Sequence, residues 1–415
     1  MPARTLKFLA LATLTALSLL LCLTFSARAL PSTSGITPFI FDDNRVFAEL
    51  TFFRPDGSPR KAYAFVDLGT PALTLNESLT NDLQFDETHP LIFQIGEMKI
   101  SVDSRAIQKN RGSGFTGPDG KKTIPVEAIL PGSIMKNYQV TFDYAAHTLT
   151  FAPPNTAKPE GIAIPCRVNE KTGLISIDAQ VAGHTYQVAI DSGSAYTWLR
   201  ADVTDQWLTA HPEWKRGKGA VGESNMQSRP DGAEAAATIL RVPEITIGSL
   251  HLGQIGALGI APKAPPFPPV SGEPPVQGNF FDWYSRKTPE PVIGWLGGNV
   301  LEGFRVTIDF PNHITYWQRE TDLDPHDLDQ VGITLENHNN EKGYFIAAIA
   351  EQNNMPTVEG LQVGDKLIQI DNLVVSDLTR GGVFTALHGK PGTIKTLILE
   401  RNGKQFTLQT KTTAF

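Results

Sequence analysis

Residues 188–199 read VAIDSGSAYTWL, an apolar strand-like run that ends on Asp191 and then turns through small residues. Residues 64–75 read AFVDLGTPALTL and place Asp67 in the same setting. An aspartate ahead of a glycine often does no more than cap a turn, so either stretch taken alone predicts only a turn. Their duplication in one chain favours a shared role for the two acids.

Each aspartate is followed by a second matching segment. ILPGSIMKNYQVTFDY at 129–144 follows the first acid, and WLGGNVLEGFRVTIDF at 295–310 follows the second. The two later segments align without a gap, so that Asp143 corresponds to Asp309. Two matches in the same order predict tandem copies of one structural unit.

The composition predicts a mostly β protein of several domains. The chain has 415 residues, more than one hydrophobic core usually supports, and 41% of them are hydrophobic. Short alternating or β-branched runs, separated by Gly, Pro and Asn, are typical of strands. The strand runs are RVFAELTFF, YQVTFDY, LISIDAQVA, TYQVAI and RVTIDF. Short helices are expected only near 76–83, 200–209, 298–303 and 380–388.

The first 29 residues resemble a signal peptide. Basic residues precede an apolar stretch from Phe8 to Phe25, and Ala27-Arg28-Ala29 has the small-x-small pattern of a cleavage site. The alternative is an uncleaved membrane anchor, because the apolar stretch is almost long enough to span a bilayer. We therefore expect an exported protein, periplasmic or extracellular, with membrane contact only if this segment is retained.

The charge of the exported chain argues against nucleic acid as a partner. Of the 36 basic residues, Arg4, Lys7 and Arg28 precede the expected cleavage point, which leaves 33 against 43 acidic residues and a net charge of about −10. Cleavage would also leave Cys166 as the only cysteine, so that no intrachain disulfide can form. Core packing alone must then hold the folds.

The Asp-Ser-Gly-Ser motif after two apolar residues, followed about a hundred residues later by an apolar pair, a glycine and a short helix, resembles the aspartic proteases of the pepsin and retropepsin type. The resemblance covers roughly residues 38–318 and implies two β lobes in tandem. We name these lobe 1 (residues 30–155) and lobe 2 (residues 156–322).

The resemblance implies that Asp67 and Asp191 face each other in one cleft as a catalytic dyad. Two carboxyl groups in contact share one proton, so that one acts as a base towards water while the other acts as an acid towards the peptide carbonyl. No metal or cofactor is then required. The residues expected to support the dyad are Gly69, Thr70, Ser192, Gly193 and Ser194. Gly69 and Gly193 allow tight turns, and the hydroxyl groups of Thr70 and Ser194 are expected to hold the outer carboxylate oxygens.

The first copy departs from the family pattern in two places. Leu68 stands where the family has Thr or Ser, so only Ser192 can supply a hydroxyl to the bonds that cross between the lobes. Pro131 stands where the second copy has Gly297, and proline removes an amide donor beneath the active-site loop. These changes bear on activity rather than on the fold.

Other interpretations of the same residues have less support. Ser194 lacks the Gly-x-Ser-x-Gly setting of a serine hydrolase nucleophile, and the nine histidines form no metal-binding motif. The stretch 262–291 is dense in proline and is expected to be a surface insertion, either an inert linker or a border of the cleft. RGSGFTGPDG at 111–120 offers a flap candidate around Gly114 and Phe115, or a plain flexible loop.

The last part of the chain has a different character. GLQVGDKLIQIDN at 360–372 resembles the signature of a bacterial PDZ domain, and the resemblance covers residues 325–412, which we name the C-terminal module. PDZ domains add a peptide as an extra strand and hold its terminal carboxylate in backbone amides. The residues expected to form that loop are Val331, Gly332, Ile333 and Thr334. The alternative is a packing module that binds nothing.

The sequence as a whole predicts an exported aspartic endopeptidase with two pepsin-like β lobes and a C-terminal PDZ domain. Its expected partners are peptides or unfolded proteins, together with a C-terminal peptide for the PDZ domain. The alternative is a catalytically silent protein that keeps the protease fold and binds peptides. Leu68 and Pro131 favour the alternative, whereas retention of both aspartates favours the enzyme.

Overall fold

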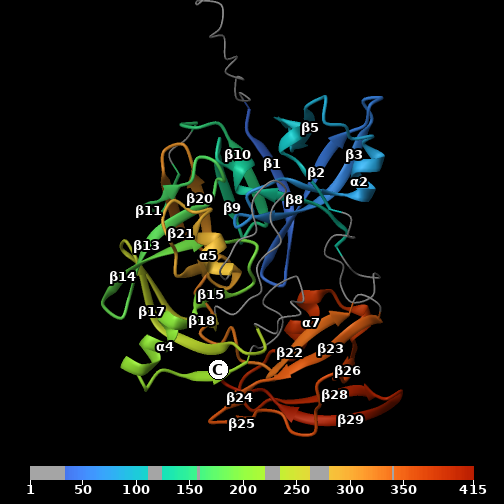
Figure 1. Ribbon diagram of the computed structural model, residues 1–415, viewed down its shortest axis with the longest axis vertical. Helices are drawn as coiled ribbons and strands as arrows, with labels where there is room; N and C mark the ends of the chain where they lie inside the picture. The colour runs from blue at the N-terminus through green and yellow to red at the C-terminus, as the bar shows by residue number, and fades with distance from the viewer. Residues whose placement is uncertain (1–32, 111–123, 157–158, 220–233, 262–279, 339–340) are drawn as a thin grey trace, which may run out of the picture. The chain divides into compact units, whose positions relative to one another are not determined.

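The structure is a computed structural model in which residues 33–110, 124–156, 159–219, 234–261, 280–338 and 341–415 are described. The predicted signal segment and the flap candidates Gly114 and Phe115 lie outside these residues. Within the described part of the chain, no helix is long and apolar enough to cross a membrane. Figure 1 labels many of the elements named below.

Lobe 1 consists of ten strands and three short helical segments among its described residues. The strands are β1 (Gly35–Asp42), β2 (Arg45–Phe53), β3 (Pro59–Asp67), β4 (Thr74–Asn76), β5 (Leu91–Ile95), β6 (Met98–Val102), β7 (Gln108–Asn110), β8 (Val126–Pro131), β9 (Gln139–Asp143) and β10 (Thr148–Ala152). The helical segments are α2 (Glu77–Asp82), η1 (Ser104–Ala106) and α3 (Gly132–Met135).

Lobe 2 repeats this plan with longer strands. Its strands are β11 (Ile162–Pro165), β12 (Arg167–Val168), β13 (Ile175–Val181), β14 (His184–Ile190), β15 (Thr197–Arg200), β16 (Arg216–Lys218), β17 (Thr238–Ile247), β18 (Leu250–Ile260), β19 (Gly294–Leu296), β20 (Phe304–Asp309) and β21 (Ile314–Arg319). Its helices are α4 (Ala201–Ala210), α5 (Phe280–Ser285) and α6 (Gly298–Leu301).

The C-terminal module has a sheet of its own. Its strands are β22 (Ile333–His338), β23 (Glu341–Ile349), β24 (Glu351–Gln352), β25 (Met355–Pro356), β26 (Lys366–Ile370), β27 (Leu373–Val374), β28 (Ile394–Arg401) and β29 (Lys404–Lys411). Its helical segments are η2 (Val375–Asp377) and α7 (Arg380–Leu387). The main sheet order is β22-β23-β26-β28-β29, and a separate hydrophobic core fills this module.

One continuous sheet joins the two lobes. Its strand order runs β11-β21-β20-β9-β10-β1 and continues through β1 into the rest of lobe 1 (Figure 1). Strands β9 and β20 are the segments that the sequence repeat aligned, and they pair antiparallel at the junction. The largest hydrophobic core accordingly contains residues of both lobes.

A local twofold axis passes between β9 and β20. Thr141 and Thr307, which correspond in the sequence repeat, face each other in the ladder, and their hydroxyl oxygens lie 2.8 Å apart. Symmetric polar contacts flank this pair. Arg305 bonds Asp143 at 3.0 Å, and Gln139 donates to Asp309 at 3.1 Å. The repeat therefore pairs with itself, which places equivalent parts of the two lobes opposite each other.

The C-terminal module contacts lobe 2 through a strand pair and through the end of the chain. Glu351 of β24 pairs with Lys218 of β16, so the sheet of lobe 2 runs on into β24 and β25. Phe415, only 1% exposed, packs with the second core of lobe 2, and its backbone N–H donates to Asp329 at 2.9 Å. The residues from 33 to 415 accordingly form one compact unit.

Most expected elements are present, and the mostly β fold class is confirmed. All four predicted helices occur within one or two residues of their expected bounds, as α2, α4, α6 and α7. The structure adds α3 and α5, which the sequence did not predict. Most of the predicted insertion, residues 262–279, lies outside the described residues, but its last part contains helix α5, in which Phe281 and Tyr284 are each only 1% exposed. Its apolar contacts with lobe 2 outweigh the nearby prolines.

The axial threonine pair is a test of the fold. Thr141→Val and Thr307→Val are each expected to lower the free energy of unfolding by about 1 kcal/mol, because each leaves the partner hydroxyl facing a methyl group. The double variant should lose less than the sum of the two, because neither hydroxyl then remains without its partner. Urea unfolding of the four proteins measures this coupling, and strict additivity would contradict a direct hydrogen bond.

Candidate active site

Equivalent strand ends position the two acids. Asp67 ends β3, which runs parallel to β8, and Asp191 directly follows β14, which runs parallel to β19. The chain then returns through β4 or β15 to pair antiparallel with the same neighbour strand. Each aspartate thus lies on a tight turn between two strands. The strand before the turn pairs parallel with the neighbour strand, and the strand after it pairs antiparallel with the same neighbour.

The two turns meet at the interface of the lobes. A methyl group placed on Gly69 would lie 2.4 Å from Oδ2 of Asp191, and one on Gly193 would lie 2.5 Å from Oδ1 of Asp67. Both distances are below van der Waals contact, so glycine is required at each position for the carboxyl groups to approach. The two carboxyl groups are close enough for each to shift the pKa of the other.

The hydrogen bonds to the two acids are unequal. Oδ1 of Asp67 accepts from the N–H of Gly69 at 2.8 Å, and its Oδ2 accepts from the Thr70 hydroxyl at 2.5 Å. Oδ1 of Asp191 accepts from the N–H of Gly193 at 2.8 Å. The structure thus places the Thr70 hydroxyl where the sequence expected it.

Ser194 does not occupy its expected place. Its hydroxyl donates to the backbone oxygen of Tyr196 at 2.7 Å instead of holding the outer oxygen of Asp191. Such a local bond within a turn is a common competitor for a serine hydroxyl. Asp191 consequently receives less stabilisation of its charged form than Asp67.

This inequality decides where the shared proton resides. Burial raises the pKa of Asp67, while the bonds from Thr70 and Gly69 oppose the shift. Burial and the charge of Asp67 together raise the pKa of Asp191 well above its ordinary value. The surroundings of Asp67 therefore stabilise a charged carboxylate more than those of Asp191, which favours the shared proton on Asp191.

A buried arginine behind the dyad was missed from the sequence. Arg45, at the start of β2, is fully buried, and its Nε donates to the backbone oxygen of Gly193 at 3.0 Å. Its positive charge lowers the pKa of both dyad acids. An arginine at the start of an apolar strand is usually exposed to solvent, so nothing in the sequence indicated that Arg45 is buried behind the dyad.

Ser192 makes both crossing bonds that the sequence left to it. Its hydroxyl donates to the backbone oxygen of Val66 at 2.8 Å and accepts from the N–H of Leu68 at 3.2 Å. The Leu68 side chain is 2% exposed and packs in the shared core. Leucine therefore replaces the reciprocal hydroxyl with apolar packing.

Pro131 lacks a backbone N–H, but lobe 1 also lacks the hydroxyl group that would accept from it. In lobe 2 the N–H of Gly297 donates to the Thr197 hydroxyl at 3.4 Å. The repeat aligns Pro131 with Gly297 and Leu73 with Thr197, so lobe 1 has lost the donor and the acceptor together. Replacement of both partners by apolar groups is energetically mild, whereas the loss of one is costly.

Tyr284 of α5 was also missed. Its ring centroid lies 5.1 Å from that of Trp295, on the strand next to β14. Burial raises the pKa of Tyr284 well above its ordinary value, and the charges of Asp191 and Asp67 raise it further. Helix α5 thus brings a tyrosine within electrostatic reach of the dyad.

The predicted carboxylate-binding loop of the C-terminal module is not open. Val331 and Ile333 are fully buried, and Thr334 is 4% exposed. The N–H of Val331 donates to Leu387, and the N–H of Ile333 donates back to Val331. A methyl group on Gly332 would lie 2.1 Å from the Thr357 hydroxyl oxygen. We therefore correct the assignment of these four residues, which are packed core rather than an exposed amide nest.

The PDZ-like signature instead has a structural explanation. Gly360 and Gly364 have positive φ angles of 84° and 90°, which favour glycine. Asp365 is 1% exposed and accepts two bonds from Arg401, at 2.6 and 2.7 Å. The motif fixes the turn before β26 through these contacts.

The described residues contain no group of three or more His, Cys, Asp or Glu side chains that could hold a metal ion. Cys166 is buried, and burial raises the pKa of its thiol to about 12. Its thiolate is therefore scarce at neutral pH, which argues against a role as nucleophile.

Comparison with known proteins identifies one part of the chain. Residues 321–399 match the PDZ domain family, so this segment is a PDZ domain. The structure is also similar to the crystal structure of Basic 7S globulin from soybean, with 10% sequence identity and a TM-score of 0.40. That match covers 70% of this chain and 96% of the globulin. No curated protein matches the sequence.

The fold is thus a pair of pepsin-like β lobes followed by a PDZ domain. The assignment of the two lobes follows from their strand topology. Each lobe carries one acid on its loop, and the two lobes share a sheet across the local twofold axis.

The raised pKa of Asp191 predicts a pH-dependent stability. A carboxyl group whose pKa is higher in the folded protein stabilises the fold at low pH, and this contribution is lost as the pH rises through the raised value. Asp191→Asn should therefore match the parent in melting temperature at pH 3 and melt higher at pH 8, by about 2–4 °C for each kcal/mol relieved.

Thermal melts of both proteins from pH 3 to pH 8 measure this difference. Asp205→Asn, at an exposed position of α4, is the control and should show no such trend. A stability gain that is largest at pH 3 would contradict the raised pKa.

Proposed function

We propose that this chain is an exported aspartic endopeptidase that hydrolyses peptide bonds in peptides or unfolded proteins. The observation that carries the proposal is the close approach of Asp67 and Asp191 across the two glycine turns, where Asp191 is buried and Asp67 is half-buried. Export rests on the signal-like first 29 residues.

The unequal environments of the two acids give each a separate role. The ionised Asp67 takes a proton from water, whose oxygen attacks the carbonyl carbon of the peptide bond. Asp191 gives its proton to the carbonyl oxygen, which forms a tetrahedral diol. When the C–N bond breaks, the proton held by Asp67 passes to the leaving nitrogen, and a diol proton returns to Asp191. The dyad ends in its starting state.

Three neighbours support these roles. Gly69 and Thr70 stabilise the ionised form of Asp67 by hydrogen bonding. The positive charge of Arg45 offsets part of the cost of burying that negative charge.

The PDZ domain supports a general role in peptide binding. We propose that it engages an extended segment of a substrate or a partner C-terminus. Among the described residues β22 pairs only with β23, but its first three residues are buried. A ligand that adds to β22 as a strand must therefore displace the contacts that cover this part.

The alternative function is peptide binding without catalysis. Leu68 favours it, because only one of the two lobes supplies a hydroxyl to the bonds that cross the interface. The two proposals differ in whether an unfolded protein is cleaved or only bound.

Substitution of the dyad separates the two proposals. Asp67→Asn and Asp191→Asn are each expected to reduce cleavage of labelled casein at least about a hundredfold, because each removes the base or the proton donor. Asp205→Asn should cleave as the parent does. Circular dichroism confirms that each variant is folded. Full activity in either dyad variant would refute the shared site, and an inactive parent that still binds casein would support the alternative.

The pH dependence of cleavage provides a second test. Activity is expected to rise as Asp67 ionises and to fall as Asp191 loses its proton, which gives a bell-shaped profile of kcat/KM. Because burial raises the pKa of both acids, the descending limb should lie above the ordinary carboxyl range. A statine-type inhibitor should abolish activity across the bell. A profile that still rises at pH 9 would contradict the mechanism.

A further inference from the structure

A cavity of about 430 Å³ lies beside helix α7. One wall is the turn between β1 and β2, at Asp42, Asp43 and Asn44, and another is formed by residues of α7. Glu302 of lobe 2 and the segment after β21 complete it. Neither dyad acid lines this cavity, so it is distinct from the proposed catalytic site.

The cavity wall is acidic. Its carboxylates are Asp42, Asp43, Glu302, Asp324 and Asp327, whereas none of the described residues that line it is Lys or Arg. A wall with this composition excludes anions and attracts cations.

Three of these acids are already satisfied by neighbours. Asp43 contacts Arg45 and bonds Arg380 at 2.8 Å. Asp42 accepts from the Thr379 hydroxyl at 2.6 Å and from a backbone N–H of α7.

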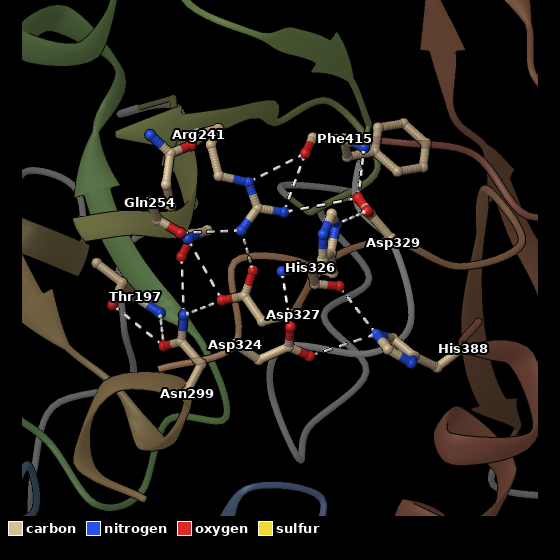
Figure 2. A network of polar contacts seen from close by, with 11 residues as sticks. Thr197, Arg241, Gln254, Asn299, Asp324, His326, Asp327, Asp329, His388 and Phe415 are labelled. Atoms are coloured by element: carbon tan, nitrogen blue, oxygen red, sulfur yellow. Dashed lines mark hydrogen bonds and ion pairs between the residues drawn. The ribbon is translucent and has the colours of Figure 1, made fainter. Parts of the chain in front are cut away.

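Asp327 contacts Arg241 and accepts from Asn299 at 2.7 Å (Figure 2). The same guanidinium bonds the backbone oxygens of Phe415 and Gln254 and lies 3.7 Å from Asp329. Arg241 is therefore fully engaged and cannot neutralise the rest of the cavity.

Glu302 and Asp324 remain. The side chain of Glu302 is half-buried and has no hydrogen bond or ion pair with another of the described residues. Glu302, Asp324 and Asp327 line the same cavity. Burial, together with the charges of Asp327 and Asp324, raises the pKa of Glu302 to about 7. Asp324 accepts from the N–H of His326 at 2.8 Å, and the His388 ring lies 3.9 Å from it (Figure 2).

An independent observation comes from Gln330. This residue lines the cavity, is 1% exposed, and its side-chain oxygen has no hydrogen-bond partner within the described part of the chain. Its backbone is fixed by bridges to His388 and Thr413, so the side chain has little freedom to seek another donor. A buried acceptor in this state lacks a donor that a ligand can supply.

A small cation with several N–H groups would complement both the acidic wall and the unpaired oxygen of Gln330. The described residues contain no group of acidic or histidine side chains close enough to hold a metal ion. An ammonium group has three rotatable donors, which suits acceptors on separate elements better than the planar fork of a guanidinium. The apolar rings of Phe41, Tyr196 and Phe384 also line the cavity and can pack against an alkyl chain.

We propose that this cavity binds a primary alkylammonium group, with Glu302, Asp324 and the Gln330 side-chain oxygen as its acceptors. The group can come from a lysine side chain of a bound peptide or from a free polyamine, since both present the same chemistry. The site joins lobe 1, lobe 2 and the PDZ domain, and it does not depend on the proposed peptidase activity.

Isothermal titration of the full chain tests the site at pH 8 and low salt. The probes are 1,5-diaminopentane and Nα-acetyl-lysine N-methylamide, with Nα-acetyl-norleucine N-methylamide as the neutral match. At least one amine is expected to bind with one-to-one stoichiometry, at least tenfold more tightly than the norleucine compound. Binding of the diamine alone identifies a free polyamine as the source, and binding of the lysine compound identifies a peptide.

Three variants assign the acceptors. Glu302→Gln should weaken amine binding at least tenfold, and Gln330→Met, which keeps the volume but removes the oxygen, should weaken it severalfold. Glu320→Gln, at an exposed position outside the cavity, should bind as the parent does. Thermal melts establish that each variant is folded. The proposal is overturned if neither amine binds at millimolar concentration, if the norleucine compound binds equally well, or if Glu302→Gln binds like the parent.

Discussion

The antiparallel pairing of β9 with β20 is the constraint on which the rest of the structure depends. Because the two strands are copies of one sequence unit, their pairing creates a local twofold axis, marked by Thr141 and Thr307. The strands and turns that carry the two acids then have counterparts across this axis. The meeting of Asp67 and Asp191 follows from that symmetry, since each lies at the same place in its own lobe.

Departures from the symmetry give the dyad its polarity. Thr70 bonds the carboxylate of Asp67, whereas Ser194 bonds a backbone oxygen, so one acid holds a charge more easily than its partner. A strictly symmetric pair would have no fixed base and no fixed acid. The asymmetry of lobe 1 at Leu68 and Pro131 is of another kind, because there apolar contacts replace polar ones without stranding a buried group.

The turn between β1 and β2 connects the three parts of the described chain. Arg45 bonds the dyad loop of lobe 2, and the side-chain amide of Asn44 donates to Ala195 at 3.3 Å. Asp42 meanwhile accepts from the first turn of α7 in the PDZ domain. Hydrogen bonds of this one turn therefore connect helix α7 to the loop that carries Asp191. The acidic cavity is lined by the same turn.

The sequence by itself identified the internal repeat, the two aspartates with their glycines, and the mostly β fold class. Strand periodicity can be read from a short stretch of sequence, and a repeat can be found by comparing the chain with itself. It also located the PDZ domain through a turn motif whose glycines need positive φ. Tertiary structure alone decided the roles of Arg45 and Tyr284 and the burial of Val331–Thr334. Whether a charge or a backbone amide is buried depends on partners far away in the chain, and no local pattern records those partners. The hydroxyl of Ser194 shows the same limit, because its choice between a carboxylate and a backbone oxygen is a matter of geometry.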